Sequence, residues 1–340
     1  MLFLYAQGSK LDSKSTGTFL SVFGIFFAVF TLCYLGFRPI NGIFVDMTMY
    51  AHMFSMFQDG EMNLSDMSGD RGFYFFIQFC ASIMDAPMFF FSCAAVYIVP
   101  LVVATMKWFK KIWFYALVML IASFSFWGYG VNGIRNGMAT SLFIFAVSFY
   151  ERRIIMILLL MLAISFHKSM ALPTLGLALT FVNNDTRKYI RLWLISIPLS
   201  LVLGNAFITI FTALGFDDER VGVYLTDNLT EDTGGFHWNF VIYSALGVVA
   251  GWYYIVKRNY EDVFYKRLVN IYIFANAFWV LIIRAGFSNR FAYLSWFLLG
   301  IIIIYPLLKV KMFSRQHQII TTIIIVYYMF TYLLNVILIS

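Results

Sequence analysis

The chain has 340 residues and a formal net charge of +7, with 61% hydrophobic, 20% aromatic and only 12% charged residues. Soluble domains carry about 25% charged residues, so this chain cannot cover a water-facing surface and is predicted to be an integral membrane protein. The composition excludes a nucleic-acid-binding domain, a secreted disulfide scaffold and an intrinsically disordered chain as primary classes.

Apolar runs along the chain predict about 11 transmembrane helices. A helix needs about 20 apolar residues to cross a hydrocarbon layer of about 30 Å, and helices satisfy their own backbone hydrogen bonds in lipid. We therefore expect an all-α bundle that forms a single transmembrane domain over 1–340. The predicted spans are 18–37, 87–106, 112–128, 136–150, 154–167, 170–183, 190–214, 239–256, 268–284, 291–308 and 318–338. The apolar run 72–85 is short, and is either a half-helix that dips into the membrane or a further span.

The basic residues divide the loops between two sides of the membrane. One set of loops carries 17 of the 24 Lys and Arg residues and the other carries seven. The positive-inside rule makes the first set cytoplasmic and the second external. Two external loops are long: 38–72, with an interfacial helix, and 215–238. The cytoplasmic loops are short and contain no Gly-rich nucleotide loop, so we expect any chemistry at the external face or within the membrane.

Four external arginines lie at the ends of predicted spans, namely Arg38, Arg135, Arg284 and Arg290. The positive-inside rule disfavours Lys and Arg on the external side, so the presence of these four arginines needs a specific explanation. Each arginine alone fits an anchor to phospholipid head groups. As a group they fit a shared anionic ligand, because guanidinium groups bind phosphate oxygens in pairs and stay charged at any working pH.

A helix in the first external loop is predicted from Asp46, Met49, Tyr50 and Met53, which recur at the spacing of one helix face. Asp46 and Tyr50 share that face. Asp46 either caps the helix or is a carboxylate aimed at a substrate hydroxyl.

His167 ends an apolar run at the same predicted level as Arg135 and Arg290. It is either a satisfied polar group or a functional one, acting as a proton acceptor or as a hydrogen-bond donor to phosphate. No His-x3-His pair occurs, and the cysteines lie in apolar runs without metal or redox spacing, so we expect no metal and no cofactor. The cysteines are Cys33, Cys80 and Cys93.

One family has a similar order of landmarks. The stretch Phe37-Arg38-x3-Gly42-x3-Asp46-x3-Tyr50 resembles the opening signature of EpsG-like, Wzy-type O-antigen and exopolysaccharide polymerases. The later marks follow in the family's order: Gly72-Phe73-Tyr74, Arg135 to Ala139, Ala163 to Ser169, and Arg290 with Tyr293. The family has a Glu-Pro-like acidic turn before the glycine, whereas this chain reads Gly69-Asp70-Arg71, which makes Asp70 the candidate substitute.

The resemblance implies a GT-C-like glycosyltransferase of the bacterial inner membrane, with its active site facing the periplasm. Such an enzyme moves a growing glycan from undecaprenyl diphosphate to a sugar hydroxyl of the next lipid-linked repeat unit. The implied partners are the undecaprenyl-diphosphate-linked oligosaccharide, the lipid bilayer and a chain-length regulator.

This chemistry needs cations for the diphosphate and a base for the hydroxyl. Preorganised arginines stabilise the leaving group, and Asp46 or His167 accepts the proton. The predicted catalytic residues are Asp46, His167, Arg135 and Arg290, and the predicted substrate-binding residues are Arg38, Tyr50, Asp70, Arg284, Asn289 and Tyr293. The alternatives are a flippase or transporter of lipid-linked oligosaccharide, an O-antigen ligase, and a membrane acyltransferase.

Overall fold

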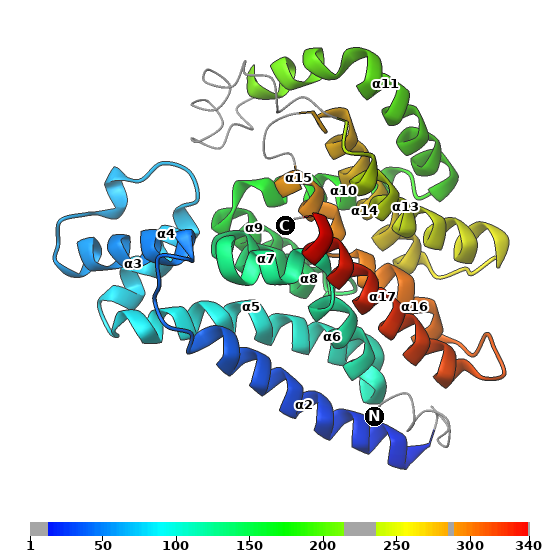
Figure 1. Cartoon of the computed structure of the whole chain (residues 1–340), viewed down its shortest axis with the longest axis horizontal. Coiled ribbons are helices and arrows are strands. Elements are labelled where there is room, and N and C mark those ends of the chain that lie inside the picture. The colour runs from blue at the N-terminus through cyan, green and yellow to red at the C-terminus, as the bar shows by residue number, and fades with distance from the viewer. Residues whose placement is uncertain (1–12, 214–235, 285–288, 339–340) are drawn as a thin grey trace. The chain divides into compact units, whose positions relative to one another are not determined.

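The computed structural model describes residues 13–213, 236–284 and 289–338, and every regular element in these ranges is a helix (Figure 1). The predicted all-α fold is confirmed for this part of the chain. The predicted loop 215–238 lies outside the described residues except for its last three. The elements are α2 (Lys14–Gly36), α3 (Val45–Gln58), η1 (Leu64–Asp66), α4 (Arg71–Ala81), α5 (Ala86–Phe109), η2 (Lys110–Ile112), α6 (Trp113–Ile121), α7 (Phe124–Asn132), α8 (Ile134–Val147), α9 (Arg153–Phe166), η3 (Lys168–Met170), α10 (Ala171–Val182), α11 (Thr186–Ala213), α13 (Trp238–Gly251), the π-helix η4 (Trp252–Lys257), α14 (Val263–Leu281), α15 (Asn289–Trp296), α16 (Leu299–Lys309) and α17 (Gln316–Leu338).

The chain forms two compact units. Unit 1 comprises Met1–Ala171 and Leu307–Ser340, and unit 2 comprises Leu172–Pro306. Unit 1 therefore contains the helices from α2 to η3 together with α17. Unit 2 contains α10 to α15 and most of α16.

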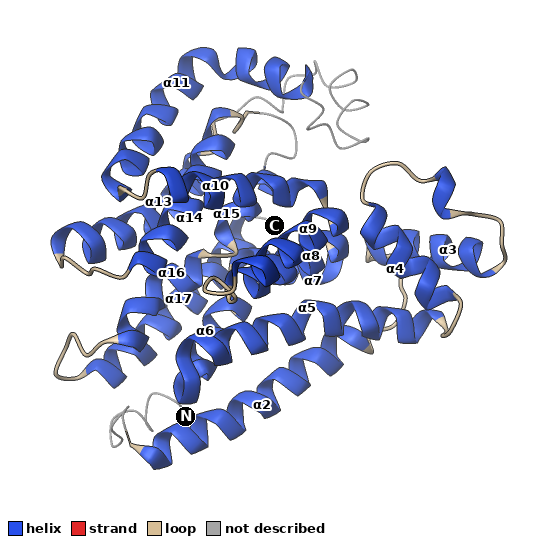
Figure 2. Ribbon diagram, turned by 180° about the vertical axis from the view of Figure 1, so that it is seen from behind, coloured by secondary structure: helices blue, strands red, loops and turns tan. Residues whose placement is uncertain are grey.

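The long helices α2 and α5 of unit 1 run antiparallel (Figures 1 and 2). Gly17 near the start of α2 lies against the side chain of Lys111, and Gly36 at its end lies against Phe91 near the start of α5. The chain thus leaves α2 and enters α5 at the same end. Between them, α4 has 11 residues and a length of about 16 Å, roughly half of a hydrocarbon layer. This geometry favours the half-helix for the run 72–85 over a crossing.

Basic residues of unit 1 gather at the opposite end of these helices. Lys107 Nζ lies 3.1 Å from the centroid of the Phe149 ring, and Lys309 Nζ lies 5.8 Å from that of Phe109. Loops far apart in the sequence, all predicted to be cytoplasmic, therefore meet at one end of the unit. Arg38 follows the other end of α2, as the sorting of charges predicts.

The predicted span 112–128 is two helices instead of one. The first, α6, ends at Ile121, and α7 begins at Phe124 after the extended residue Ser123. The carbonyl of Ala122 accepts a hydrogen bond of 2.9 Å from the hydroxyl of Thr331 on α17. A break in a buried apolar helix is tolerated where a neighbouring side chain satisfies the freed backbone group.

Several described helices are long and apolar enough to cross a membrane. Five meet both conditions: Lys14–Gly36, Ala86–Ile121, Trp238–Lys257, Arg290–Lys309 and Gln316–Leu334. Three apolar helices are shorter: Ile134–Val147, Arg153–Phe166 and Lys168–Val182. These helices support a multi-pass membrane protein, while the count of 11 and the GT-C-like arrangement stay predictions.

A buried polar network joins four helices of unit 2. The side-chain amide of Asn276 on α14 accepts from Trp193 Nε1 at 2.7 Å and donates to the hydroxyls of Ser244 and Ser295, each at 2.9 Å. Ser244 Oγ also accepts from Trp296 Nε1 at 2.7 Å. Because Ser295 and Trp296 belong to α15, this network fixes the short helix whose first turn contains Arg290.

A Trp193→Phe variant is expected to lower the free energy of unfolding by about 1–3 kcal/mol, because it leaves the buried Asn276 Oδ1 without its donor. Thermal unfolding in detergent measures the effect. The matched control is Trp279→Phe, since the buried Nε1 of Trp279 makes no hydrogen bond. Equal losses in the two variants would mean that ring volume, and not the network, stabilises unit 2.

Candidate functional site

Asp70, Arg135 and His167 meet in unit 1, from three separate segments of the chain. Arg135 Nη1 lies 2.9 Å from Asp70 Oδ2, and His167 Nε2 lies 4.0 Å from the same oxygen. Asp70 and His167 are almost fully buried, whereas the side chain of Arg135 is 20% exposed. The cluster therefore has a cation at its accessible side and a carboxylate and an imidazole behind it.

Asp70 is held from both of its oxygens. It precedes α4 as the N-cap residue, and its Oδ1 accepts a 2.7 Å hydrogen bond from the backbone N–H of Lys168, while Oδ2 faces Arg135. A buried carboxylate is tolerated when its charge is paired and its lone pairs are used. Asp70 thus links the start of α4 to the corner between α9 and η3.

Arg135 lies in the first turn of α8, where the helix dipole is positive and a cation is unfavourable. Asp70 compensates for this position. The same Nη1 also donates to Tyr74 Oη at 3.3 Å. The guanidinium of Arg135 is thus held in place by Asp70 at the positive end of a helix dipole. An anion that binds here would meet a preorganised cation.

His167 follows the last residue of α9 in an extended conformation, and its side chain caps the start of η3, the next helix along the chain. Its Nδ1 accepts the backbone N–H of Ser169 at 3.2 Å and lies 2.6 Å from the Ser169 hydroxyl. That hydroxyl is also 3.3 Å from Asn136 Oδ1 on α8. The imidazole orientation is therefore set by the turn that follows it and by the helix of Arg135.

A close approach between α4 and α9 fixes the distance between these residues. A Cβ atom at Gly72 would clash with Ser165 Oγ, and it would lie 2.8 Å from Ser165 Cβ and 3.0 Å from the Ser165 backbone carbonyl carbon. The hydroxyl can rotate away, but the backbone atom cannot. Glycine at this position lets the start of α4, with Asp70, reach the end of α9, with His167.

A Gly72→Ala variant is expected to lower the free energy of unfolding by about 1–3 kcal/mol through overpacking, and to separate Asp70 from its partners. Thermal unfolding in detergent measures the loss. Gly42→Ala is the control, because a Cβ at Gly42 meets nothing within 4 Å. Unchanged stability of the Gly72 variant would show that α4 can shift freely.

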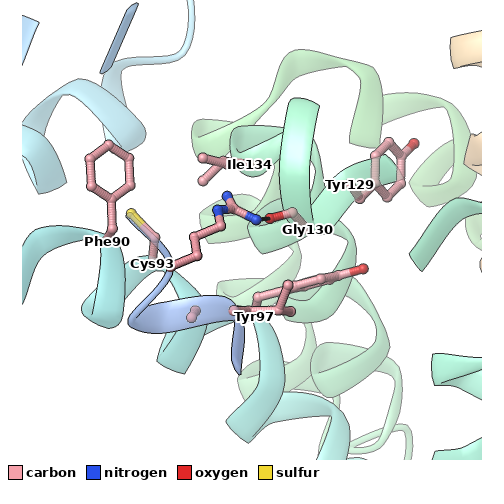
Figure 3. Close-up of a pocket in the computed structure, with 9 residues that line it drawn as sticks. Phe90, Cys93, Tyr97, Tyr129, Gly130 and Ile134 are labelled. Atoms are coloured by element: carbon pink, nitrogen blue, oxygen red, sulfur yellow. Dashed lines mark hydrogen bonds between the residues drawn. The ribbon is translucent and has the colours of Figure 1, made fainter. Parts of the chain in front are cut away.

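Arg38 lines a small pocket bounded by the end of α2, by α5 and by the α7–α8 junction (Figure 3). Its Nη1 donates to the carbonyl of Gly130 at 2.8 Å, and its Nε is buried without a hydrogen-bond partner. Burial lowers the pKa of the Arg38 guanidinium from its usual value. Figure 3 shows Phe90 and Cys93 on one side of the pocket and Tyr129 on the other. A partly desolvated cation attracts an anion more strongly than an exposed one.

The helix predicted within 38–72 is present as α3, with a different buried face, while its interfacial position stays a prediction. Its buried side chains are Met47, Tyr50, Phe54 and Phe57, so Tyr50 is on the predicted face while Met49 and Met53 are not fully buried. Tyr50 packs edge-on against Phe73 of α4, with ring centroids 4.9 Å apart.

The capping interpretation of Asp46 is wrong. The N-cap of α3 is Phe44, which makes no side-chain capping bond. Asp46 instead lies in the first turn of α3, where a carboxylate interacts favourably with the helix dipole. It is partly exposed.

The remaining predicted residues belong to unit 2. Arg284 follows α14, packs against Gly204 and donates from Nη2 to the Leu201 carbonyl at 3.4 Å. Arg290 is exposed in the first turn of α15, and the Tyr293 ring lies 5.6 Å from that of Trp296. Asn289 opens α15, and its side chain lies outside what the structure describes. The structure thus brings together three predicted residues, Asp70, Arg135 and His167, within unit 1.

Three further side chains of the cluster are absent from the predicted site: Tyr74, Asn136 and Ser169. Two of them carried a signal, because Tyr74 belongs to the family landmark Gly72-Phe73-Tyr74 and Ser169 to the landmark Ala163 to Ser169. Asn136 had none beyond its place next to Arg135. In the described part of the chain, no group of three or more His, Cys, Asp or Glu residues is placed to hold a metal ion.

The chain matches the model of the EpsG family over residues 21–340. The matched range contains the whole cluster and the Arg38 pocket. No curated protein and no solved structure matches the chain.

Proposed function

This chain belongs to the EpsG family, and we propose on that premise that it is a Wzy-type polysaccharide polymerase. It acts at the periplasmic face of the bacterial inner membrane. It transfers a growing glycan from undecaprenyl diphosphate to a hydroxyl of a new lipid-linked repeat unit. The observation that carries the proposal is the pairing of Arg135 with Asp70 beside His167 in a largely buried cluster.

The reaction exchanges one bond at the anomeric carbon for another. The bond from that carbon to the diphosphate oxygen breaks, and its electron pair stays with the diphosphate. The oxygen of the acceptor hydroxyl forms the new glycosidic bond, and its proton passes to a base. Negative charge thus grows on the leaving group, where a preorganised cation lowers the barrier most.

Arg135 is the proposed partner of that growing charge. It is held by Asp70 at 2.9 Å, so its guanidinium is oriented before substrate binds. Arg38 has a partly desolvated charge and a buried Nε to offer a second phosphate oxygen. The roles of Arg284 and Arg290 stay predictions from the sequence.

Sidedness supports a periplasmic site. The cluster lies at the end of unit 1 where the chain passes between α2 and α5, away from the basic end near Lys107 and Lys309.

A flippase would bind the same diphosphate without chemistry. Its polar residues would be expected near the membrane midplane, while the arginines of this chain lie at predicted span ends.

Reconstitution with purified lipid-linked repeat units tests the proposal. Proteoliposomes that contain the chain are expected to produce a ladder of lengthened, lipid-linked glycans and to release undecaprenyl diphosphate. Substrate moved unchanged to the opposite leaflet would indicate a flippase, and transfer to lipid A core would indicate an O-antigen ligase. Either outcome without a ladder overturns the polymerase. Adding a chain-length regulator is expected to change the length distribution and not the linkage.

A further inference from the structure

The turn after α9 determines which nitrogen of His167 carries the proton. The backbone N–H of Ser169 donates to Nδ1 at 3.2 Å. A backbone amide is only a donor, so Nδ1 must present its lone pair to it. In the neutral imidazole the single proton is then on Nε2.

The Ser169 hydroxyl reinforces this assignment. It lies 2.6 Å from Nδ1 and 3.3 Å from Asn136 Oδ1, and the shorter contact favours donation of its one proton to the Nδ1 lone pair. A proton on Nδ1 would point at the Ser169 N–H and lose that hydrogen bond. The Nδ1 lone pair, which is the only ring lone pair of neutral histidine, is therefore directed into the protein.

Asp70 is a charged group that faces the imidazole ring, and its charge is already paired with Arg135. It therefore does not need a positively charged His167 as a partner. Asp70 Oδ1 accepts from the Lys168 backbone, and Asp70 Oδ2 is paired with Arg135 at 2.9 Å. His167 Nε2 is 4.0 Å from Oδ2, which is too long for a hydrogen bond. Asp70 is thus neutralised by Arg135.

We propose that His167 acts as a hydrogen-bond donor through Nε2–H, and not as the base, with Ser169 as its positioning residue. The inference rests on the proposed function. The acceptor of the bond is a phosphate oxygen of the leaving group beside Arg135, and no proton is transferred from His167. Of the two bases considered from the sequence, Asp46 then remains the candidate acceptor of the hydroxyl proton.

The tautomer can be measured without any assay of activity. Nitrogen-15 NMR of the full chain, labelled at histidine, distinguishes a protonated from an unprotonated ring nitrogen. The chain has four histidines, and His167→Gln identifies the signal of His167 by its loss. We expect an unprotonated Nδ1 and a protonated Nε2. A protonated Nδ1 in the resting protein overturns the inference whether or not the chain is a polymerase.

Substitutions separate a donor from a base. His167→Gln places an amide N–H near the position of Nε2, whereas His167→Asn places it near Nδ1 and His167→Ala removes it. If His167 is a donor, the Gln variant should retain activity within about tenfold, with the wild-type pH profile. The Asn and Ala variants should lose about 10²–10³-fold. A Gln variant as inactive as Ala, with unchanged thermal unfolding, overturns the donor role.

Binding of undecaprenyl diphosphate to the same variants in detergent gives a second measurement. We expect the Gln variant to bind like wild type and the Ala variant to bind more weakly. If wild type makes no polymer but this order holds, the proposed function fails and the donor role stands. If wild type makes polymer but all variants bind alike, the donor role fails and the function stands.

Discussion

An Arg135→Ala variant is expected to lose chain elongation by about 10²–10³-fold, which is the effect of removing one preorganised donor from a site of developing negative charge. Arg135 has the geometry for this role, because Asp70 orients it at 2.9 Å and its side chain stays 20% exposed. The measurement is the rate of glycan lengthening in proteoliposomes that contain equal amounts of folded protein.

Arg71→Ala is the control for this variant. Arg71 is exposed in the first turn of α4 and next to Asp70 in sequence, so its loss removes the same charge without touching the cluster. Arg135→Lys is expected to restore little, because an ammonium cannot copy a planar guanidinium that contacts Asp70 and Tyr74 and, as proposed, also binds a phosphate. Wild-type glycan lengths from Arg135→Ala would remove this residue from the site.

An Asp70→Asn variant is expected to have the second largest effect, a loss of about 10–100-fold in elongation. The amide oxygen can still accept from the Lys168 backbone, so the substitution removes the charge and keeps the contact to η3. Without the carboxylate, Arg135 is no longer held in the orientation that the leaving group needs, and misplaced groups lose rate steeply. The same proteoliposome assay measures the loss.

A double-mutant cycle makes this prediction specific. If Asp70 acts through Arg135, the Asp70→Asn, Arg135→Ala double variant should be no slower than Arg135→Ala alone. Asp59→Asn, which changes an exposed carboxylate of unit 1, is the control for charge loss and should be normal. Additive losses in the cycle would mean that Asp70 has a role that does not depend on Arg135.

Arg135→Ala and Asp70→Asn are also expected to lower the free energy of unfolding. The control variants distinguish this loss of stability from a loss of catalytic rate. Removing one partner of a buried ion pair is destabilising, because the other charge is left desolvated. The effect should be larger for Arg135→Ala than for Asp70→Asn, since Asp70 is the more buried partner. Thermal unfolding of each variant in detergent should therefore precede its activity assay.

Three residues of the candidate site were predictable one by one, but their arrangement was not. Arg135, Asp70 and His167 were each named from the sequence for a separate reason: charge on a disfavoured side, a substituted acidic turn, and a polar end of an apolar run. Their contact joins residues 65 and 97 positions from Asp70, and it depends on how α4 packs against α8 and α9. The protonation of His167 depends on a single backbone hydrogen bond from Ser169, which no spacing rule contains.

Two predictions differ from the structure because of contacts between helices, which local patterns do not contain. A helix forms where the first long loop predicts one, but its buried face contains the aromatic residues Tyr50, Phe54 and Phe57 and not Met49 and Met53. The apolar run 112–128 was read as one span because hydropathy does not detect a break at Ala122–Ser123. That break is stabilised by Thr331, about 200 positions later in the chain.

The sequence by itself determined the class of this protein: few charges and long apolar runs require a lipid environment, lipid requires helices, and the distribution of Lys and Arg divides the loops into two sets. These properties depend on composition and on local sequence patterns, which do not change with the way the helices pack. Only the tertiary structure decided which polar groups meet, because the approach of Gly72 to Ser165, the pairing of Asp70 with Arg135 and the burial of the His167 lone pair arise from packing between helices that are distant in sequence.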